Sequence, residues 1–316
     1  DAVLTGTKSG LVPINPSRVV DTRVGGGGRR LAAGVEQRFQ ITGGAVPAGS
    51  AVALNVTVVG ANADGWVSLW PCGPWSGSST VNFDAGDVVA NHTIVPVDNR
   101  GGVCVKGSAS VEVVVDVTGV FAAGKGAMFT ALNPVRVADT RISSPVRRPG
   151  PGEVVALNVA PAGGCAFKLS GRVVASSVGS YVTVWPCDRP RPLASSVNVD
   201  AGAVRSNQVL VQVGAGGLVC FSSPTSVDLV VDKVGEFSAG GLAWFQPVVP
   251  FRLKDTRFAR QVELGVGFPD RLPGNIQVGV NMAGTRGLPA GSVAVESNVV
   301  VVDPVAAGWF SAWECG

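Results

Sequence analysis

One short pattern occurs three times, and its spacing sets the scale of the fold. The pattern R-x-x-D-T-R begins at Arg18, Arg136 and Arg252, so successive copies lie 118 and 116 residues apart. A period of roughly 20–50 residues is typical of a solenoid or propeller, whereas a period this long allows each copy to be a domain with its own core. The sequence therefore predicts tandem domains.

Other short motifs follow each copy in the same order. They are Pro-Ala-Gly, an aromatic-x-x-x-Trp-x-Cys block, an S-[ST]-V-N-x-D-A-G turn, a Val-Cys pair and a closing acidic strand. The third copy ends one residue after its first cysteine, so we expect it to lack about the last 48 residues of a full repeat. The predicted division is an N-terminal arm (1–10), repeat 1 (11–123), repeat 2 (124–240) and a truncated repeat 3 (241–316). The arm is either a loose segment or an added edge strand.

Composition and periodicity favour an all-β fold. The chain has 43 Gly, 21 Pro and few strong helix formers, and in repeat 1 short apolar runs alternate with turn residues. We predict three tandem β-sandwich repeats with jelly-roll-like order, the third incomplete. The run 111–117 is apolar on both faces and is expected to be a central strand, and the short joints predict a rod of domains. The strands predicted in repeat 1 are 17–22, 37–42, 51–59, 66–70, 80–83, 92–97, 103–106 and 111–117.

The cysteines carry information about the compartment. Two of them recur in both complete repeats, 32 and 33 residues apart, without C-x-x-C spacing or nearby histidines, so we predict two intradomain disulfides and an oxidising environment. Buried reduced thiols are the alternative, and a bond between Cys165 and Cys315 stays open. The absence of a visible signal peptide leads us to expect that an export signal has been removed. The predicted disulfide residues are Cys72, Cys104, Cys187 and Cys220.

Several classes of function find no support in the sequence. No apolar run approaches the roughly 18–20 residues of a membrane-spanning segment. The net charge of +3 is spread along the chain, so a nucleic-acid partner is not expected. His92 is the only histidine and is Gln208 in repeat 2, so no catalytic triad or metal cluster recurs. We expect no enzyme activity, no metal and no cofactor.

The R-x-x-D-T-R motif has two interpretations. Its arginine fork could bind a carboxylate or sugar hydroxyls. Alternatively, the aspartate pairs with a flanking arginine or caps a turn while the threonine bonds to the backbone, which fixes where the first strand joins the sheet. We favour the structural interpretation because the motif stands beside a proline at the start of every repeat. The residues given this role are Arg18, Asp21, Arg136, Asp139, Arg252 and Asp255.

The aromatic pair four residues apart lies on one face of a strand. An exposed face would offer a platform for sugar rings, whereas a buried one would pack tryptophan against the disulfide. We favour burial for Trp70, Trp185 and Trp313, beside cysteine, and leave both readings open for the first aromatic. The alternative carbohydrate site comprises Trp66, Tyr181, Trp309, Arg23, Arg141 and Arg257.

Two weaker patterns also occur in repeat 1. The turn holding Asp84 and Asp87 could bind calcium, but an Asx-turn is the favoured interpretation because repeat 2 has Ala203 in place of Asp87. Asn55-Val-Thr and Asn91-His-Thr match glycosylation sequons, a pattern that is common by chance.

The motifs occur in the order P-x-R-x-x-D-T-R, V-P-A-G, L-N-V-T, G-W/Y-x-x-x-W-P-C, S-x-x-N-x-x-A-G, V-C-V and D-V-x-G-x-F. This order resembles a β-rich repeat found in tandem in secreted and surface proteins of bacteria. The resemblance covers nearly the whole chain and implies export and a modular extracellular role, with no established activity. Repeat 2 departs from it by reading Leu169-Ser-Gly-Arg172 where repeat 1 has Leu54-Asn-Val-Thr57.

We therefore expect a non-enzymatic exported structural or adhesive protein that forms part of a filament, fibre, surface layer or particle. Its partners would be other protein chains. A lectin-like module that recognises cell-surface glycans is the alternative. A half-repeat would expose sheet edges, so either further residues of the same protein complete repeat 3, which we favour, or another chain adds the strands.

Overall fold

The computed structural model describes residues 8–43, 50–142, 145–159, 166–174, 178–257, 271–285, 288–306, 308–312 and 314, with residues 166–172 and 174 described by their backbone. Regular structure in this part of the chain is almost entirely β, as the sequence predicts. Two short 3-10 turns, η1 (Thr22–Val24) and η2 (Ala215–Gly217), accompany the strands.

Repeat 1 is a sandwich of two four-stranded antiparallel sheets. The sheet orders are β1-β8-β3-β6 and β2-β7-β4-β5, which is the interleaved order of a jelly roll. The two inner faces enclose one apolar core. The strands are β1 (Ser9–Asp21), β2 (Glu36–Gln40), β3 (Ala51–Val59), β4 (Gly65–Trp70), β5 (Val81–Phe83), β6 (Val88–Pro96), β7 (Gly102–Gly107) and β8 (Glu112–Ala123).

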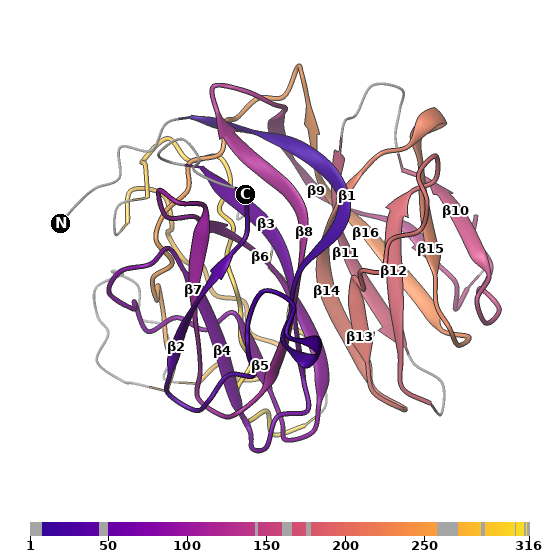
Figure 1. Cartoon of the computed structure of the whole chain (residues 1–316). Coiled ribbons are helices and arrows are strands. Elements are labelled where there is room, and N and C mark those ends of the chain that lie inside the picture. Colours follow the sequence, from indigo (N-terminus) through magenta and orange to yellow (C-terminus); the bar gives the residue numbers. More distant parts are fainter. Residues whose placement is uncertain are drawn as a thin grey trace.

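Repeat 2 has the same topology, with sheet orders β14-β11-β16-β9 and β10-β15-β12-β13. Its core is separate from that of repeat 1. Figure 1 shows the two sandwiches side by side, repeat 1 in indigo to purple and repeat 2 in pink to orange. The strands are β9 (Met128–Asp139), β10 (Val154–Asn158), β11 (Ala166–Val174), β12 (Ser180–Pro186), β13 (Val197–Val199), β14 (Val204–Gln212), β15 (Leu218–Ser222) and β16 (Asp228–Ser238).

All eight strands predicted for repeat 1 are present, although β1 and β6 begin earlier and β8 ends later than predicted. Strand β3 has the predicted limits, and β8 lies between β1 and β3, which confirms its central position. Strand β1 begins at Ser9, well before the predicted 17, because its first residues pair with the end of β8. Residues Ser9 and Gly10, expected in the arm, thus belong to an edge strand.

The predicted rod of domains is wrong, because residues near the start of the three repeats form backbone bridges with one another in a closed cycle. The residues of repeat 3 that take part lie outside any strand, since the described residues after Ser238 form none. Residues at matching positions form antiparallel bridges from repeat 1 to 2, from 2 to 3 and from 3 back to 1. Each bridge has two backbone hydrogen bonds with N···O distances of 2.8 or 2.9 Å. The three bridges are Leu11–Ala127, Phe129–Ala243 and Phe245–Ser9. The short joints therefore hold the repeats around a common centre rather than in a line.

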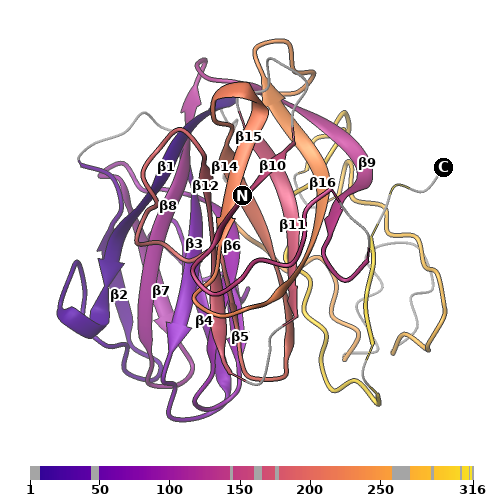
Figure 2. The ribbon, with the colours of Figure 1, turned by 90° about the vertical axis from the view of Figure 1, so that its right-hand side faces the viewer.

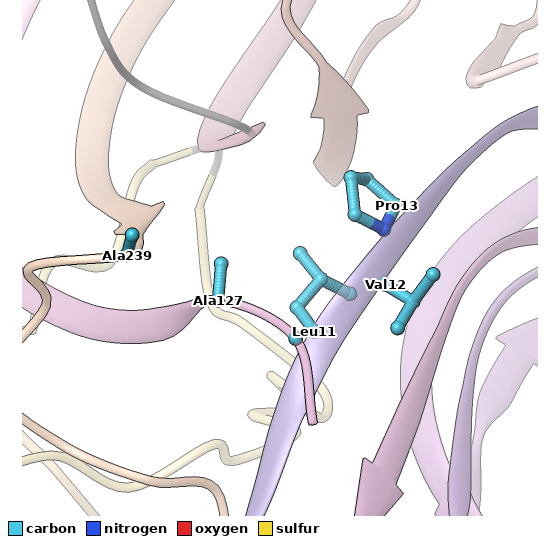
Figure 3. Close-up of a pocket in the computed structure, with 6 residues that line it drawn as sticks. Leu11, Val12, Pro13, Ala127 and Ala239 are labelled. Carbon is cyan, nitrogen blue, oxygen red and sulfur yellow. The ribbon is translucent and has the colours of Figure 1, made fainter.

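Glycine allows the backbones to come this close. A Cβ atom on Gly10 would lie 2.4 Å from the Lys125 carbonyl oxygen, and one on Gly126 would lie 2.5 Å from the Leu11 carbonyl oxygen. Gly126 also has φ of +87°, which side chains rarely tolerate. Beside this crossing lies an open apolar hollow of about 270 Å³ (Figure 3). Its lining residues are Leu11, Val12, Pro13, Gly126, Ala127 and Ala239.

Aromatic side chains from all three repeats meet at the centre of the cycle. Phe121 of repeat 1 contacts Phe237 of repeat 2 and Phe245 of repeat 3, with ring centroids 5.8 and 4.4 Å apart. Phe129 contacts Phe237 at 4.9 Å. Phe121 and Phe237 belong to one cluster of buried residues that the repeats share, and Phe129 and Phe245 are partly buried against it. Burial of apolar surface therefore stabilises the cycle as a unit.

Repeat 1 packs against repeat 2 through small residues on β3. Leu54 and its alternate neighbours point into the sandwich, while Ala51, Ala53, Asn55 and Thr57 lie on the other face and are also buried. Short side chains let β13 and β14 of repeat 2 approach this sheet. In Figure 2 repeat 1 lies on the left, repeat 2 in the centre and the C-terminal residues, in yellow, on the right.

Candidate functional site

The three copies of R-x-x-D-T-R form the same clamp. In repeat 1 the Asp21 carboxylate accepts hydrogen bonds from Nε and Nη2 of Arg23, at 2.8 and 2.6 Å, and from the Arg23 backbone N–H at 3.2 Å. Asp139 with Arg141 and Asp255 with Arg257 repeat the arrangement with side-chain distances between 2.7 and 2.9 Å. The arginine hydrogen bonds lower the pKa of all three aspartates below their ordinary value.

The threonine of the motif fastens the clamp to the last strand of its repeat. The Thr22 hydroxyl donates to Glu112 and accepts the Val113 backbone N–H at 2.8 Å. The Thr140 hydroxyl likewise donates to Asp228 at 3.0 Å and accepts the Leu229 N–H at 2.9 Å. In the first two repeats the motif therefore holds the end of the first strand against the closing strand.

The first arginine of the motif reaches the acidic residue in the middle of the closing strand. Arg18 donates from Nε to Asp116 at 2.9 Å, and Arg136 donates from Nε to Asp232 at 2.6 Å. Burial raises the pKa of Asp116 above its ordinary value, although the hydrogen bond from Arg18 opposes this rise. A buried carboxylate held by one arginine is costly to leave unpaired. This cost explains why the arginine and the aspartate are present together in repeats 1 and 2.

Arg18 also joins repeat 1 to repeat 2. Its Nη2 donates to the Leu193 carbonyl oxygen at 3.2 Å, and the Ser195 backbone N–H donates to Asp116. Nearby, the Asn55 amide donates to the Ser195 carbonyl oxygen at 2.6 Å. The S-[ST]-V-N turn of repeat 2 therefore sits in a polar socket of repeat 1.

Asn207 completes this junction from inside repeat 2. Its amide donates to Asn55 Oδ1 at 2.8 Å and to the Ser196 carbonyl oxygen at 2.7 Å, and its own oxygen accepts the His92 backbone N–H at 2.8 Å. Asn55 and Asn207 are both buried, so their amide groups are satisfied only by each other and by these backbone groups.

Repeat 3 makes the same junction with repeat 1. Arg252 donates from Nη2 to the Gly77 carbonyl oxygen at 3.0 Å. Asn298 donates to the Ser79 carbonyl oxygen at 2.8 Å and accepts a hydrogen bond from the Asn91 amide at 3.1 Å. Gly77, Ser79 and Asn91 stand 116 residues before Leu193, Ser195 and Asn207, so an arginine and a pair of asparagines hold the same part of the turn in both junctions.

The tryptophans beside cysteine are buried, as we favoured. Trp70 and Trp185 lie opposite Cys104 and Cys220 in register. The Trp70 indole N–H donates to the Gly73 carbonyl oxygen at 2.9 Å, and Arg191 lies over the Trp185 ring. Trp313 lies outside the described residues.

The first aromatic of each block has a different setting in each repeat. Trp66 stacks on Trp75 with centroids 4.9 Å apart, and Lys106 lies over the Trp75 ring at 5.1 Å. Tyr181 is 37% exposed and Trp309 is 83% exposed. Within the described part of the chain, the cations that lie over aromatic rings are Lys106 and Arg191, not Arg23, Arg141 or Arg257. Arg23, Arg141 and Arg257 donate instead to the aspartates of their own motifs.

Sequence reasoning missed Trp75 and Lys106. Trp75 occupies the same repeat position as Arg191, and each packs on an aromatic ring of its own repeat. A comparison of the loops after the W-P-C block could have found this position, because it holds a large side chain in both complete repeats.

The predicted disulfides are present. Cys72 pairs with Cys104 and Cys187 pairs with Cys220, across sequence separations of 32 and 33 residues. In repeat 1 the bond links the loop after β4 to β7, and in repeat 2 it links the loop after β12 to β15. Each disulfide therefore cross-links the sheet that contains these two strands and stabilises its repeat. Cys165 and Cys315 lie outside the described residues.

The weaker patterns of repeat 1 are the turn with Asp84 and Asp87 and the two sequons. No group of three or more potential metal-ligating side chains is found in the residues that the structure describes. The Asp87 backbone N–H donates to the Asp84 carbonyl oxygen at 3.2 Å, and the Asp84 backbone N–H donates to the Asp87 carboxylate at 3.2 Å. The first bond makes this a β-turn, without the side-chain bond from Asp84 that the favoured Asx-turn implies. Buried Asn55 is inaccessible to glycosylation in the folded protein. Among the described residues, no helix is both long and apolar enough to cross a membrane.

Comparisons with known proteins place the chain in no family. No family model matches, and no curated protein matches. The tandem CBM22 domains at the N-terminus of Xyn10C from Paenibacillus barcinonensis align over 73% of this chain and 96% of theirs, with 10% identity and a TM-score of 0.20. An uncharacterised Listeria monocytogenes protein crystallised with glucose, magnesium and calcium aligns over 73% of this chain and 22% of its own, with 12% identity and a TM-score of 0.21.

The extracellular domain of ANXUR1 from Arabidopsis thaliana aligns over 69% of this chain and 85% of its own, with 10% identity and a TM-score of 0.21. TM-scores this low carry no functional argument.

Proposed function

We propose that this protein is a non-enzymatic, exported building block of an extracellular structure, and that R-x-x-D-T-R is its assembly motif. The observation that carries the proposal is where the motif's arginines donate. The second arginine clamps its own aspartate, and the first donates to a neighbouring repeat in two of the three copies. An arginine fork engaged in this way has few donors left for a ligand.

The closed cycle of backbone bridges supports a structural role. It joins the three repeats by paired backbone hydrogen bonds and a shared aromatic cluster. The two disulfides suit an oxidising, extracellular setting. The proposed unit is thus a rigid particle of repeats rather than a flexible string.

The test is the state of the native material. We expect its size by light scattering to exceed that of one chain, electron microscopy to show a regular fibre, layer or particle, and reduction to loosen it. Native material that stays monomeric at every concentration, with no regular structure, would contradict the proposal.

A second candidate function is carbohydrate binding, and the stacked pair Trp66 and Trp75 favours it. Trp75 is 38% exposed, and Lys106 and Asn82 lie on the same sheet face. Together they offer an aromatic edge with polar neighbours, a combination that suits sugars. On a glycan array, a hit that Trp75→Ala removes and Trp244→Ala keeps would support this candidate. Silence across cell-wall sugars would count against it.

A further inference from the structure

Repeat 2 presents the same polar face that repeat 1 buries. Arg136 and Asp232 are paired across β9 and β16 just as Arg18 and Asp116 are paired across β1 and β8. The Asp116 side chain is 1% exposed but that of Asp232 is 27% exposed, and the arginines are 28% and 51% exposed. The difference arises because the turn of repeat 2 covers Asp116, whereas no described residue of repeat 3 donates to or accepts from Arg136 or Asp232 in the same way.

In both covered junctions, between repeats 1 and 2 and between repeats 3 and 1, the arginine binds a backbone carbonyl oxygen. Arg18 donates to the Leu193 carbonyl oxygen and Arg252 donates to the Gly77 carbonyl oxygen. Each carbonyl lies two residues before an S-[ST]-V-N turn. The socket thus recognises one backbone carbonyl and, at Asp116, one backbone N–H of the turn.

We infer that the Arg136–Asp232 face is a third socket, and that its occupant is the S-[ST]-V-N turn of a complete third repeat. A backbone bridge already joins repeat 3 to repeat 1, at the positions that join repeat 1 to repeat 2, so a complete third repeat would face repeat 2 as repeat 2 faces repeat 1. Its turn would present a carbonyl to Arg136 and a backbone N–H to Asp232.

A second copy of this chain does not supply that turn. The sequence contains two S-[ST]-V-N turns, which begin at Ser79 and Ser195. The first is held by Asn298 and the second by Asn55. With both turns engaged inside one molecule, the occupant has to be a third turn with the same backbone geometry.

The third socket differs from the others at one position. Ser170 stands opposite Asp232 in register, where Asn55 stands opposite Asp116 in repeat 1. The pair of asparagine amides found in both covered junctions is therefore not available there. The third socket depends on Arg136 and Asp232, which makes these two residues the ones to test.

The experiment completes repeat 3 in register and asks whether the socket becomes covered. Residues 74–121 of repeat 1 are appended after Gly316, so that Cys315 gains the counterpart of Cys104. Amide hydrogen exchange of β9 is then compared between the 316-residue chain and the extended chain. We expect exchange around Arg136 to slow by about tenfold or more in the extended chain, and Arg136→Ala to abolish the slowing. Glu153→Gln, an exposed change on repeat 2, should leave it in place.

Each other outcome decides against the inference. Unchanged exchange around Arg136 in an extended chain whose third disulfide has formed would overturn it. If this graft forms no third disulfide, residues 189–237 of repeat 2 replace it, and failure of both grafts also contradicts a completed third repeat. A dimer of the 316-residue chain that protects Arg136 would assign the socket to a second copy. The structural function proposed above survives all of these outcomes.

Discussion

Repeats 1 and 2 share one topology, one motif and one disulfide, yet the same arginine–aspartate pair is buried in one and exposed in the other. In repeat 1 the pair Arg18–Asp116 lies beneath the turn of repeat 2. In repeat 2 the pair Arg136–Asp232 lies at the surface. The contribution of this pair to the free energy of folding therefore depends on whether a neighbouring repeat covers it, and not on the motif alone. Identical residues act as a junction in one place and as a surface ion pair in the other.

The largest expected effect comes from removing the two aspartates separately. Asp116→Ala leaves Arg18 without its carboxylate and the Ser195 N–H without an acceptor, so we expect a loss of about 3 kcal/mol in the free energy of unfolding. Asp232→Ala removes an exposed pair and should cost less than about 1 kcal/mol. Urea unfolding of both variants measures the difference. Equal losses would show that Asp116 is not held by the junction.

The asparagine junction should have the next largest effect. Asn207→Ala leaves buried acceptors and the His92 N–H unpaired, so we expect a cost of about 1–3 kcal/mol. Asn91→Ala removes the matching contact between repeats 3 and 1, which lies nearer the surface, and should cost less. A double-mutant cycle with Asn55→Ala should give a coupling energy above about 0.5 kcal/mol. Additive losses would contradict the proposed Asn55–Asn207 contact.

The individual repeat was largely predictable from the sequence, because its signals are local. Alternating residues such as those of β3 indicate a strand, and two cysteines recurring at one spacing indicate a disulfide. The clamp between Asp21 and Arg23 was also predictable, since the two residues are neighbours in the chain.

The arrangement of the repeats was not predictable. The cycle depends on pairs such as Phe129 with Ala243, whose residues carry no pattern that points to each other. Arg18 also joins repeat 1 to repeat 2 by donating to the Leu193 carbonyl oxygen. Because every residue has a backbone carbonyl, nothing in the sequence marks this one as the acceptor. Trp75 escaped notice because its counterpart in repeat 2 is Arg191, a residue of another type that packs on a different ring.

Acid should weaken the clamps in all three repeats. The folded state lowers the pKa of Asp21, Asp139 and Asp255 below the ordinary value of 3.8. Their contribution to stability is therefore complete above that pH and is lost as the pH falls through the lowered values. Asp116 acts in the opposite direction, because burial raises its pKa and protonation relieves the cost of its charge.

Unfolding in urea at pH 6, 4 and 3 tests this balance. We expect the midpoint concentration of urea to fall below pH 4, and Asp139→Asn to reduce that fall because it removes one of the clamping carboxylates. Asp116→Asn should instead steepen it, since a carboxyl group whose protonation favours the folded state is gone. A midpoint that rises steadily between pH 4 and 3 would contradict the clamp.

The smallest expected effect lies at the rim of the junction between repeats 1 and 2. Arg205 bridges Asp87 of repeat 1, at 3.3 Å, and Asp200 of repeat 2, at 3.2 Å. Because these side chains are partly exposed, water and salt screen their interaction, and Arg205→Ala should cost less than about 1 kcal/mol at low salt. The cost should vanish in 1 M salt, at which the Debye length is about 3 Å, whereas the cost of Asn207→Ala should persist. If salt removes both effects alike, the junction is held by its exposed rim, and the contrast between buried and exposed copies of the motif loses its physical basis.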